Sequence, residues 1–190
     1  YKLKNLSYLR LENNQLKKLP KRFGALASLE ELNLAKNELE ELPESIGQMK
    51  YLSVLNLDQN NLSTLPKSIG SLTQLTEISL YKNKLKELPE SIGGLKNLKT
   101  LKIIFNELES LPSSLGECKN LEELIAYENQ LEVLPKSISD LSNLRTLWVS
   151  NNNLKSLPES IGKLEKLEVL SVYDNTLSTL PKSIEVMNNL

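Results

Sequence analysis

The stretch Leu144–Lys166, LRTLWVSNNNLKSLPESIGKLEK, is the unit from which the whole chain is built. Apolar residues occupy positions one, four, six, eleven, fourteen, eighteen and twenty-one of these 23 residues, asparagine occupies position nine, and proline occupies position fifteen. The pattern recurs without insertion or deletion in eight repeats, which begin at Leu6, Leu29, Leu52, Leu75, Leu98, Leu121, Leu144 and Leu167. A fixed period of this length is typical of a solenoid, in which each unit packs on its neighbours.

Each repeat is expected to contribute one short strand followed by tight turns. The opening LxxLxL segment alternates apolar and polar residues, which is the two-residue period of a strand with one buried face. The asparagine at position nine offers two donors and an acceptor, so we expect a ladder of asparagines that joins backbone groups of successive turns. The proline at position fifteen cannot donate to a sheet, and only about one helical turn fits between it and the next glycine. This outer segment is therefore predicted to form 3₁₀ or irregular turns.

Two repeat positions of the outer segment, nineteen and sixteen, give further predictions. Ser139 in repeat six and Glu185 in repeat eight replace the glycine of position nineteen, so these two outer turns are expected to differ from the others. Position sixteen mostly alternates between lysine and glutamate, as at Glu44 and Lys67. Opposite charges one rung apart attract modestly, so we interpret this column as structural.

The pattern LxxLxLxxNxLxxLPxxIGxLxx resembles the leucine-rich repeat family over the whole chain, and its LPxxIG variant is similar to Ras-group, Roco-type and bacterial members. The resemblance implies an α/β-type repeat solenoid, a curved horseshoe with a parallel β-sheet on its concave face and short 3₁₀ or irregular turns on its convex face. It also implies a usual role in binding other proteins. The unbroken period predicts a single domain over residues 1–190, with both ends cut in mid-repeat.

Composition argues against several classes of function. The chain has 23 basic and 24 acidic residues without a long run of one sign, so we expect no nucleic-acid partner, and it has no apolar run long enough for membrane insertion. It contains no histidine, which removes histidine-based triads and the usual zinc ligand sets. Cys118, the single cysteine, stands in a leucine position and is read as a small buried hydrophobe. We therefore predict no enzyme activity, catalytic residue, metal ligand or cofactor.

The cellular location stays open at this point. One cysteine and the absence of cysteine-rich caps favour a reducing compartment or a bacterial source. Cytoplasmic and bacterial secreted or surface locations are both compatible with the chain.

A candidate binding site emerges from apolar residues that the core positions do not explain. Positions five, seven and eight should project from or border the concave strand face. In repeats one to three these nine places hold one apolar residue, Ala35, whereas in repeats four to eight fifteen places hold seven. The seven are Tyr81, Ile104, Phe105, Ile125, Tyr127, Trp148 and Tyr173, and the polar residues around them are Lys82, Lys102, Glu128, Asn151 and Asp174. Exposed apolar patches with aromatic anchors are typical of contact sites.

The preferred function is a noncatalytic interaction module that binds a protein or peptide on the concave face of repeats four to eight. One alternative is carbohydrate or cell-wall glycan binding, with Tyr127, Trp148 and Tyr173 as stacking platforms. Another is the recognition arm of a larger enzyme, such as a GTPase or ubiquitin ligase, whose catalytic domain lies outside these residues. Two structural explanations also stay open. The seven residues could simply suit strands or cover one another, or repeat six could shift by one residue and bury Ile125 and Tyr127 instead of Ala126.

Overall fold

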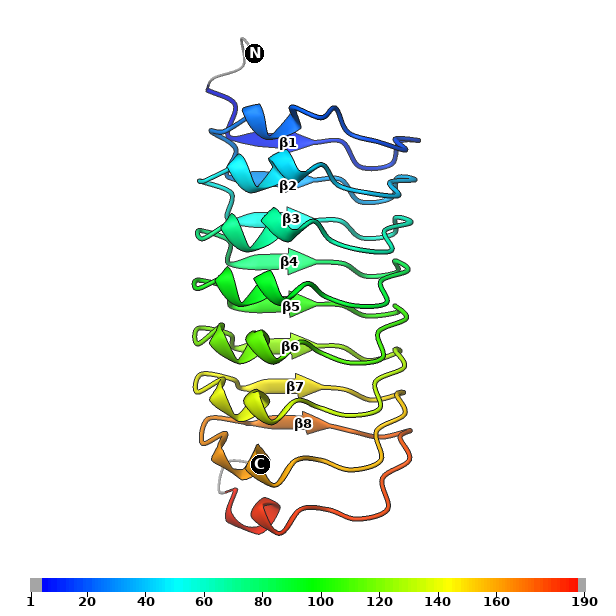
Figure 1. Ribbon diagram of the computed structural model, residues 1–190, viewed down its shortest axis with the longest axis vertical. Coiled ribbons are helices and arrows are strands. Elements are labelled where there is room, and N and C mark those ends of the chain that lie inside the picture. The colour runs from blue at the N-terminus through cyan, green and yellow to red at the C-terminus, as the bar shows by residue number, and fades with distance from the viewer. Residues whose placement is uncertain (1–4, 188–190) are drawn as a thin grey trace.

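Eight short parallel strands in one open sheet organise residues 5–187, the part of the chain that the computed structural model describes (Figure 1). The strands are β1 (Tyr8–Arg10), β2 (Glu31–Asn33), β3 (Val54–Asn56), β4 (Glu77–Ser79), β5 (Thr100–Lys102), β6 (Glu123–Ile125), β7 (Thr146–Trp148) and β8 (Val169–Ser171). Their order in the sheet follows the chain, and each residue pairs with its equivalent in the next repeat, as Leu124 does with Leu147. Equivalent residues therefore stack in columns along the array.

A 3₁₀ helix in each repeat forms a second column beside the sheet (Figure 1). The helices are η1 (Phe23–Ala25), η2 (Glu44–Gln48), η3 (Lys67–Ser71), η4 (Glu90–Gly94), η5 (Ser113–Glu117), η6 (Lys136–Asp140), η7 (Glu159–Lys163) and η8 (Lys182–Val186). From η2 onward each helix follows a proline in extended conformation, such as Pro43, whose carbonyl accepts the N–H of Ile46 at 2.9 Å. The predicted solenoid, with a parallel sheet and 3₁₀ turns, is confirmed.

The core lies between these two columns and consists of stacked leucine and isoleucine side chains. In the middle of the array they have no exposure to solvent, as at Leu55, Ile69 and Leu101. The equivalent residues of the first and last repeats, such as Leu9 and Leu170, are only partly buried. Each of these two repeats has one neighbouring repeat among residues 5–187, and a repeat buries its apolar side chains against its neighbours.

Cys118 occupies a leucine position of this core and has no exposed surface. Its Sγ atom donates to the carbonyl oxygen of Ile92 at 3.4 Å. Burial raises the pKa of the Cys118 thiol to about 11, so the thiol is protonated at neutral pH. The interpretation of Cys118 as a buried hydrophobe is confirmed.

The asparagine column ties successive repeats together. Asn106 accepts the N–H of Leu85 at 3.0 Å through Oδ1 and donates to the carbonyl of Leu80 at 2.9 Å through Nδ2, and both partners belong to the preceding repeat. The same two contacts recur at Asn37, Asn60, Asn83, Asn129, Asn152 and Asn175. The predicted asparagine ladder is confirmed.

The expectation for the outer turn of repeat six was wrong. Helix η6 covers the same five positions as its neighbours although Ser139 replaces glycine, and the Ser139 hydroxyl donates to the Lys136 carbonyl at 2.9 Å. The outer turn of repeat eight does differ, because Met187 at its end has a ψ of 98° compared with 73° at Leu164. The first helix, η1, also departs from the pattern, with three residues instead of five.

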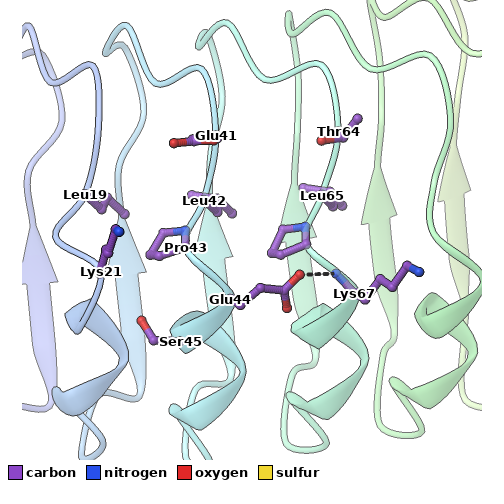
Figure 2. Close-up of a pocket in the computed structure, with 11 residues that line it drawn as sticks. Leu19, Lys21, Glu41, Leu42, Pro43, Glu44, Ser45, Thr64, Leu65 and Lys67 are labelled. Atoms are coloured by element: carbon purple, nitrogen blue, oxygen red, sulfur yellow. Dashed lines mark hydrogen bonds between the residues drawn. The ribbon is translucent and has the colours of Figure 1, made fainter.

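The glutamates of position sixteen bind backbone amides of the next repeat and form no ion pair with the ammonium groups of the neighbouring lysines. The Glu44 carboxylate accepts the N–H of Lys67 at 3.2 Å and that of Ser68 at 3.0 Å, at the start of η3 (Figure 2). The Ser68 hydroxyl and these two amides lower the pKa of Glu44. No ion pair between described residues joins two members of this column. The glutamates of the column therefore bind amides at the start of η3, η5 and η8, which agrees with the structural interpretation of the column, although no lysine–glutamate ion pair forms within it.

Candidate functional site

The candidate site lies on the strand face, the side of the sheet from which positions three, five and seven of each repeat project. Burial in repeat six shows which side chains face the core, because Ala126 is fully buried while its neighbours Ile125 and Tyr127 are half-buried. Ile125 pairs in register with Trp148 of β7. This register excludes the alternative in which repeat six shifts by one residue.

Four aromatic side chains from consecutive repeats form a continuous row on the strand face, the aromatic row of Tyr81, Phe105, Tyr127 and Trp148. Successive ring centroids lie 5.8 Å, 6.1 Å and 6.4 Å apart. Aromatic pairs at such distances attract by about 0.5–1.5 kcal/mol beyond the effect of area burial. The rings cover one another only in part, since Phe105 and Trp148 each remain 40% exposed. The row therefore leaves apolar surface in contact with solvent.

The turn after the strand places Phe105, the member of the aromatic row at position eight. Position eight has a positive φ in every repeat, from 49° at Asp174 to 58° at Asn13. Asparagine and aspartate adopt this left-handed conformation readily, but a bulky residue such as Phe105, with a φ of 53°, is an outlier there. Such backbone strain costs on the order of 1 kcal/mol and persists where the surroundings compensate for it. At Phe105 the N–H donates to the Tyr127 carbonyl of the next repeat at 3.2 Å, and the ring contacts with Tyr81 and Tyr127 offset part of the cost.

Replacing Phe105 with asparagine is expected to change the free energy of unfolding by less than about 1 kcal/mol, because relief of backbone strain offsets the two lost ring contacts. Urea denaturation followed by circular dichroism measures this change. The control is Asn13→Phe, which puts phenylalanine into the same conformation at an exposed position of repeat one and is expected to destabilise by about 1 kcal/mol. A loss above about 2 kcal/mol for Phe105→Asn would show that Phe105 serves stability.

Polar contacts fix the end of the aromatic row nearer the N-terminus. Asp58 Oδ1 accepts the hydroxyl of Ser79 at 2.6 Å and the N–H of Tyr81 at 2.9 Å. The Nζ atom of Lys82 lies 5.2 Å from the ring centroid of Tyr81 and 5.6 Å from that of Phe105. Both distances are within the range of a cation–π interaction. This end of the row therefore has a cation supplied by the chain itself.

At its other end the row borders a small depression, the aromatic hollow. The hollow has a volume of about 270 Å³ and is lined by Tyr127, Trp148, Ser150, Ser171 and Tyr173. The hydroxyl oxygens of Ser150 and Ser171 are 2.7 Å apart and share a hydrogen bond. Tyr173 is 63% exposed. Three rings and two hydroxyls thus surround one site at repeats six to eight.

None of the seven apolar residues predicted from the sequence lies in the core. Tyr81, Ile104, Ile125 and Tyr127 are half-buried, and Phe105, Trp148 and Tyr173 are exposed. Four of them form the aromatic row, and Tyr173 joins Tyr127 and Trp148 around the hollow. The isoleucines come from the same repeats as Phe105 and Tyr127 but contribute no ring contact.

Sequence reasoning missed several parts of the site. Ser150 and Ser171 line the hollow but give no apolar signal, and Asp58 could not be connected with Tyr81 from spacing alone. Position three also bears apolar side chains on this face, where Tyr8 and Val169 are 57% and 41% exposed. Apolar surface on the strand face therefore extends beyond the predicted positions.

Larger hollows near the 3₁₀ helices follow from the repeat geometry. One of about 640 Å³ lies between the Leu-Pro segments of repeats one to three and is bordered by Pro43 and Glu44 (Figure 2). One of about 600 Å³ recurs two repeats later, bordered by Pro89 and Glu90. Because equivalent residues line both hollows, nothing in their composition distinguishes one as a specific site.

Residues 5–187 contain neither a metal-ligand cluster nor a membrane-spanning helix. Across residues 5–187, no group of three or more cysteine, aspartate or glutamate side chains could hold a metal ion. Within the same residues, no helix has the length and apolar character needed to cross a bilayer. What the strand face presents is rings, hydroxyls and separate charges, which are groups suited to contact with another molecule.

Comparison with protein-family models defines the class of protein. A model described as a leucine-rich repeat region matches residues 1–85 and 67–149, and a model of two leucine-rich repeat copies matches residues 142–183. The chain belongs to the leucine-rich repeat family. This family and fold commonly mediate protein–protein interaction and are typically noncatalytic. A comparison with curated proteins gave no match.

Solved structures of bacterial and plant proteins are similar to this chain. A leucine-rich repeat protein of Leptospira interrogans is 35% identical over 98% of the chain, with a TM-score of 0.62. The functional domain of InlJ from Listeria monocytogenes is 26% identical over 97% of the chain, with a TM-score of 0.81. The plant peptide hormone receptor RGFR1, in complex with RGF2, is 28% identical over 99% of the chain, with a TM-score of 0.69. The chain spans 65%, 38% and 35% of these proteins respectively.

Proposed function

We propose that residues 1–190 form a single noncatalytic interaction domain that binds a protein or peptide partner through the strand face of repeats four to eight. The observation that carries this proposal is the aromatic row, in which rings from four consecutive repeats touch one another and still expose apolar surface. Exposed apolar surface is unfavourable in water, and aromatic side chains commonly anchor interfaces. A partner that covers the row removes this surface from water.

Rigid presentation is the proposed mechanism of binding. Each ring of the row is held by its neighbours, and Asp58 fixes the backbone at Tyr81. The strands below are tied by a parallel register that is continuous from β1 to β8. Binding to a preformed surface orders few additional groups, so more of the contact energy remains as affinity. RGFR1, which is similar over 99% of this chain, was solved with a bound partner, and this supports the proposal by analogy.

The double variant Tyr127→Ala, Trp148→Ala tests the proposal. Partners captured from lysate by the immobilised chain are identified, and the affinity of each purified partner is then measured by calorimetry. We expect the double variant to bind about 30-fold more weakly, because it removes two aromatic anchors. The matched control is Tyr51→Ala, Val133→Ala, which removes two exposed apolar side chains outside the aromatic row. Unchanged affinity in a folded double variant contradicts the proposal.

Glycan binding is a second candidate, favoured by the three rings and two hydroxyls of the aromatic hollow. Sugars stack on aromatic faces and exchange hydrogen bonds with hydroxyl groups, so the composition of the hollow suits them. Trp148 is the only tryptophan of the chain, and its fluorescence therefore reports on this site. Saturable quenching by a member of a glycan panel, without any captured protein, would favour this alternative. The recognition-arm alternative is tested by the full-length reading frame.

A further inference from the structure

We propose that the aromatic hollow binds a cationic side chain, the ammonium of a lysine or the guanidinium of an arginine, carried by the protein or peptide partner. The inference rests on the proposed function and specifies the partner chemistry that repeats six to eight select. It follows from three observations: the rings that enclose the hollow, a cation–π contact elsewhere in the same row, and the charge of the neighbouring residues.

The first observation is the composition of the hollow. Tyr127, Trp148 and Tyr173 present three π systems to one volume of about 270 Å³. The faces of aromatic rings carry negative charge density and attract cations within about 6 Å of the centroid, with tryptophan the strongest. The volume is just below the roughly 300–1,000 Å³ of pockets for drug-sized molecules, so it suits a single side chain. None of the five residues that line the hollow is charged.

The second observation is the contact made by Lys82 at the opposite end of the row. Its Nζ atom lies between 5 and 6 Å from the ring centroids of Tyr81 and Phe105, two rings that are themselves 5.8 Å apart. Tyr127 and Trp148 have a similar separation of 6.4 Å, but the residues lining their hollow include no lysine or arginine. One ring pair of the row, edge-to-face with an interplanar angle of 81°, therefore holds a cation of the chain, whereas the other, tilted at 51°, borders a hollow whose lining residues supply none.

The third observation is a change of charge along position eight, the column next to the hollow. The earlier repeats place Lys36 and Lys82 in this column, whereas repeats six and eight place Glu128 and Asp174 there. These two acidic residues directly follow Tyr127 and Tyr173 in the chain. An acidic rim attracts cations and disfavours anions, so charge and rings select the same ligand.

Polar groups near the hollow are already paired within the chain. Asn151, which follows the lining residue Ser150, donates through Nδ2 to the carboxylate of Glu128. Arg145, the basic residue nearest to Trp148 in the sequence, already forms an ion pair with Glu168.

Fluorescence titration of Trp148 with charged and neutral probes tests the inference. The probes are the N-acetyl, N-methylamide derivatives of lysine, arginine and norleucine, added at constant ionic strength. Norleucine keeps the aliphatic stem of lysine but lacks its charge. We expect saturable changes with the lysine and arginine probes, at apparent Kd values at least about fivefold lower than that of norleucine. Equal affinity for all three probes overturns the inference.

Variants of the hollow sharpen this test. Tyr173→Leu removes one ring and is expected to weaken binding of the lysine probe about fivefold. Glu128→Gln, Asp174→Asn removes the acidic rim and is expected to weaken it about threefold. Tyr51→Leu changes an exposed tyrosine away from the site and is expected to have no effect. Affinity for the lysine probe that is unchanged in the folded Tyr173→Leu variant also overturns the inference.

The probe titration and the partner affinity distinguish failure of the cation inference from failure of the proposed function. If the Tyr127→Ala, Trp148→Ala variant loses its partner while the wild type binds lysine and norleucine probes equally, the cation inference alone is wrong. If the double variant keeps full affinity for the partner, the proposed function is wrong whatever the probes do.

Discussion

Replacing Asn106 with alanine is expected to lower the free energy of unfolding by about 3–5 kcal/mol. Asn106 lies in the middle of the asparagine ladder, where it binds the N–H of Leu85 and the carbonyl of Leu80. Leu80 and Leu85 have no exposure to solvent, so water does not replace the lost partner. A buried backbone group left without a hydrogen bond costs about 1–3 kcal/mol. Two such groups, together with the cavity left by the missing side-chain amide, account for the expected loss of unfolding free energy.

Asn14→Ala is the matched control for this prediction. Asn14 occupies the same repeat position, but it is exposed and donates to the Leu11 and Glu12 carbonyls of its own repeat. Its removal is expected to cost less than about 1 kcal/mol. Urea denaturation followed by circular dichroism and by Trp148 fluorescence measures both variants. Small and equal losses of unfolding free energy in the two variants would contradict the stabilising role of the asparagine ladder.

Replacing Gly70 with alanine is expected to destabilise the protein by about 3 kcal/mol. A Cβ atom at Gly70 would lie 2.0 Å from the carbonyl oxygen and 2.8 Å from the carbonyl carbon of Ser91, in the next turn of the solenoid. These are backbone atoms, so no side-chain rotation relieves the clash, and η3 and η4 must move apart. The glycine is required here by the close approach of two repeats.

Ser139→Ala provides the comparison for Gly70→Ala. Ser139 occupies the same repeat position, and η6 accommodates its Cβ atom within a helix of unchanged length. Because only a hydroxyl hydrogen bond to Lys136 is lost, the expected change is below about 1 kcal/mol. Thermal denaturation of both variants gives the two values. A Gly70→Ala variant as stable as Ser139→Ala would show that the repeats separate at little cost.

The parts of the fold that repeat exactly in sequence could be predicted from it. The alternation in LxxLxL places the strands, the constant period fixes their register, and the proline of position fifteen marks where the 3₁₀ helices begin. The features that the sequence did not predict concern contacts between neighbouring repeats. Nothing in the spacing of Glu44 shows that its carboxylate binds amides in place of a lysine side chain. Ser139 is likewise accommodated in η6 without a change in helix length, which the spacing does not show.

The candidate site could be predicted in outline but not in detail. Strand alternation identifies which side chains lie outside the core, and this placed Tyr127 and Trp148 on the surface. The contacts between rings depend on side-chain rotation and on the positive φ of position eight. That conformation is usually signalled by glycine or asparagine, but here it also occurs at Lys82, Phe105 and Glu128. The sequence therefore gives no sign that the side chains of Lys82 and Phe105 contact the rings of the row.

The parallel register from β1 to β8 keeps the interior of this protein independent of the side chains on its strand face. Every unit offers its neighbours nearly the same leucines and the same asparagine, so loss of residues 98–120 would leave a seven-unit interior of the same kind. It would also delete Phe105 and bring Tyr81 one rung, about 4.8 Å, closer to Tyr127. Gain or loss of whole units can thus change the spacing of the rings on the strand face while the stacked core stays intact.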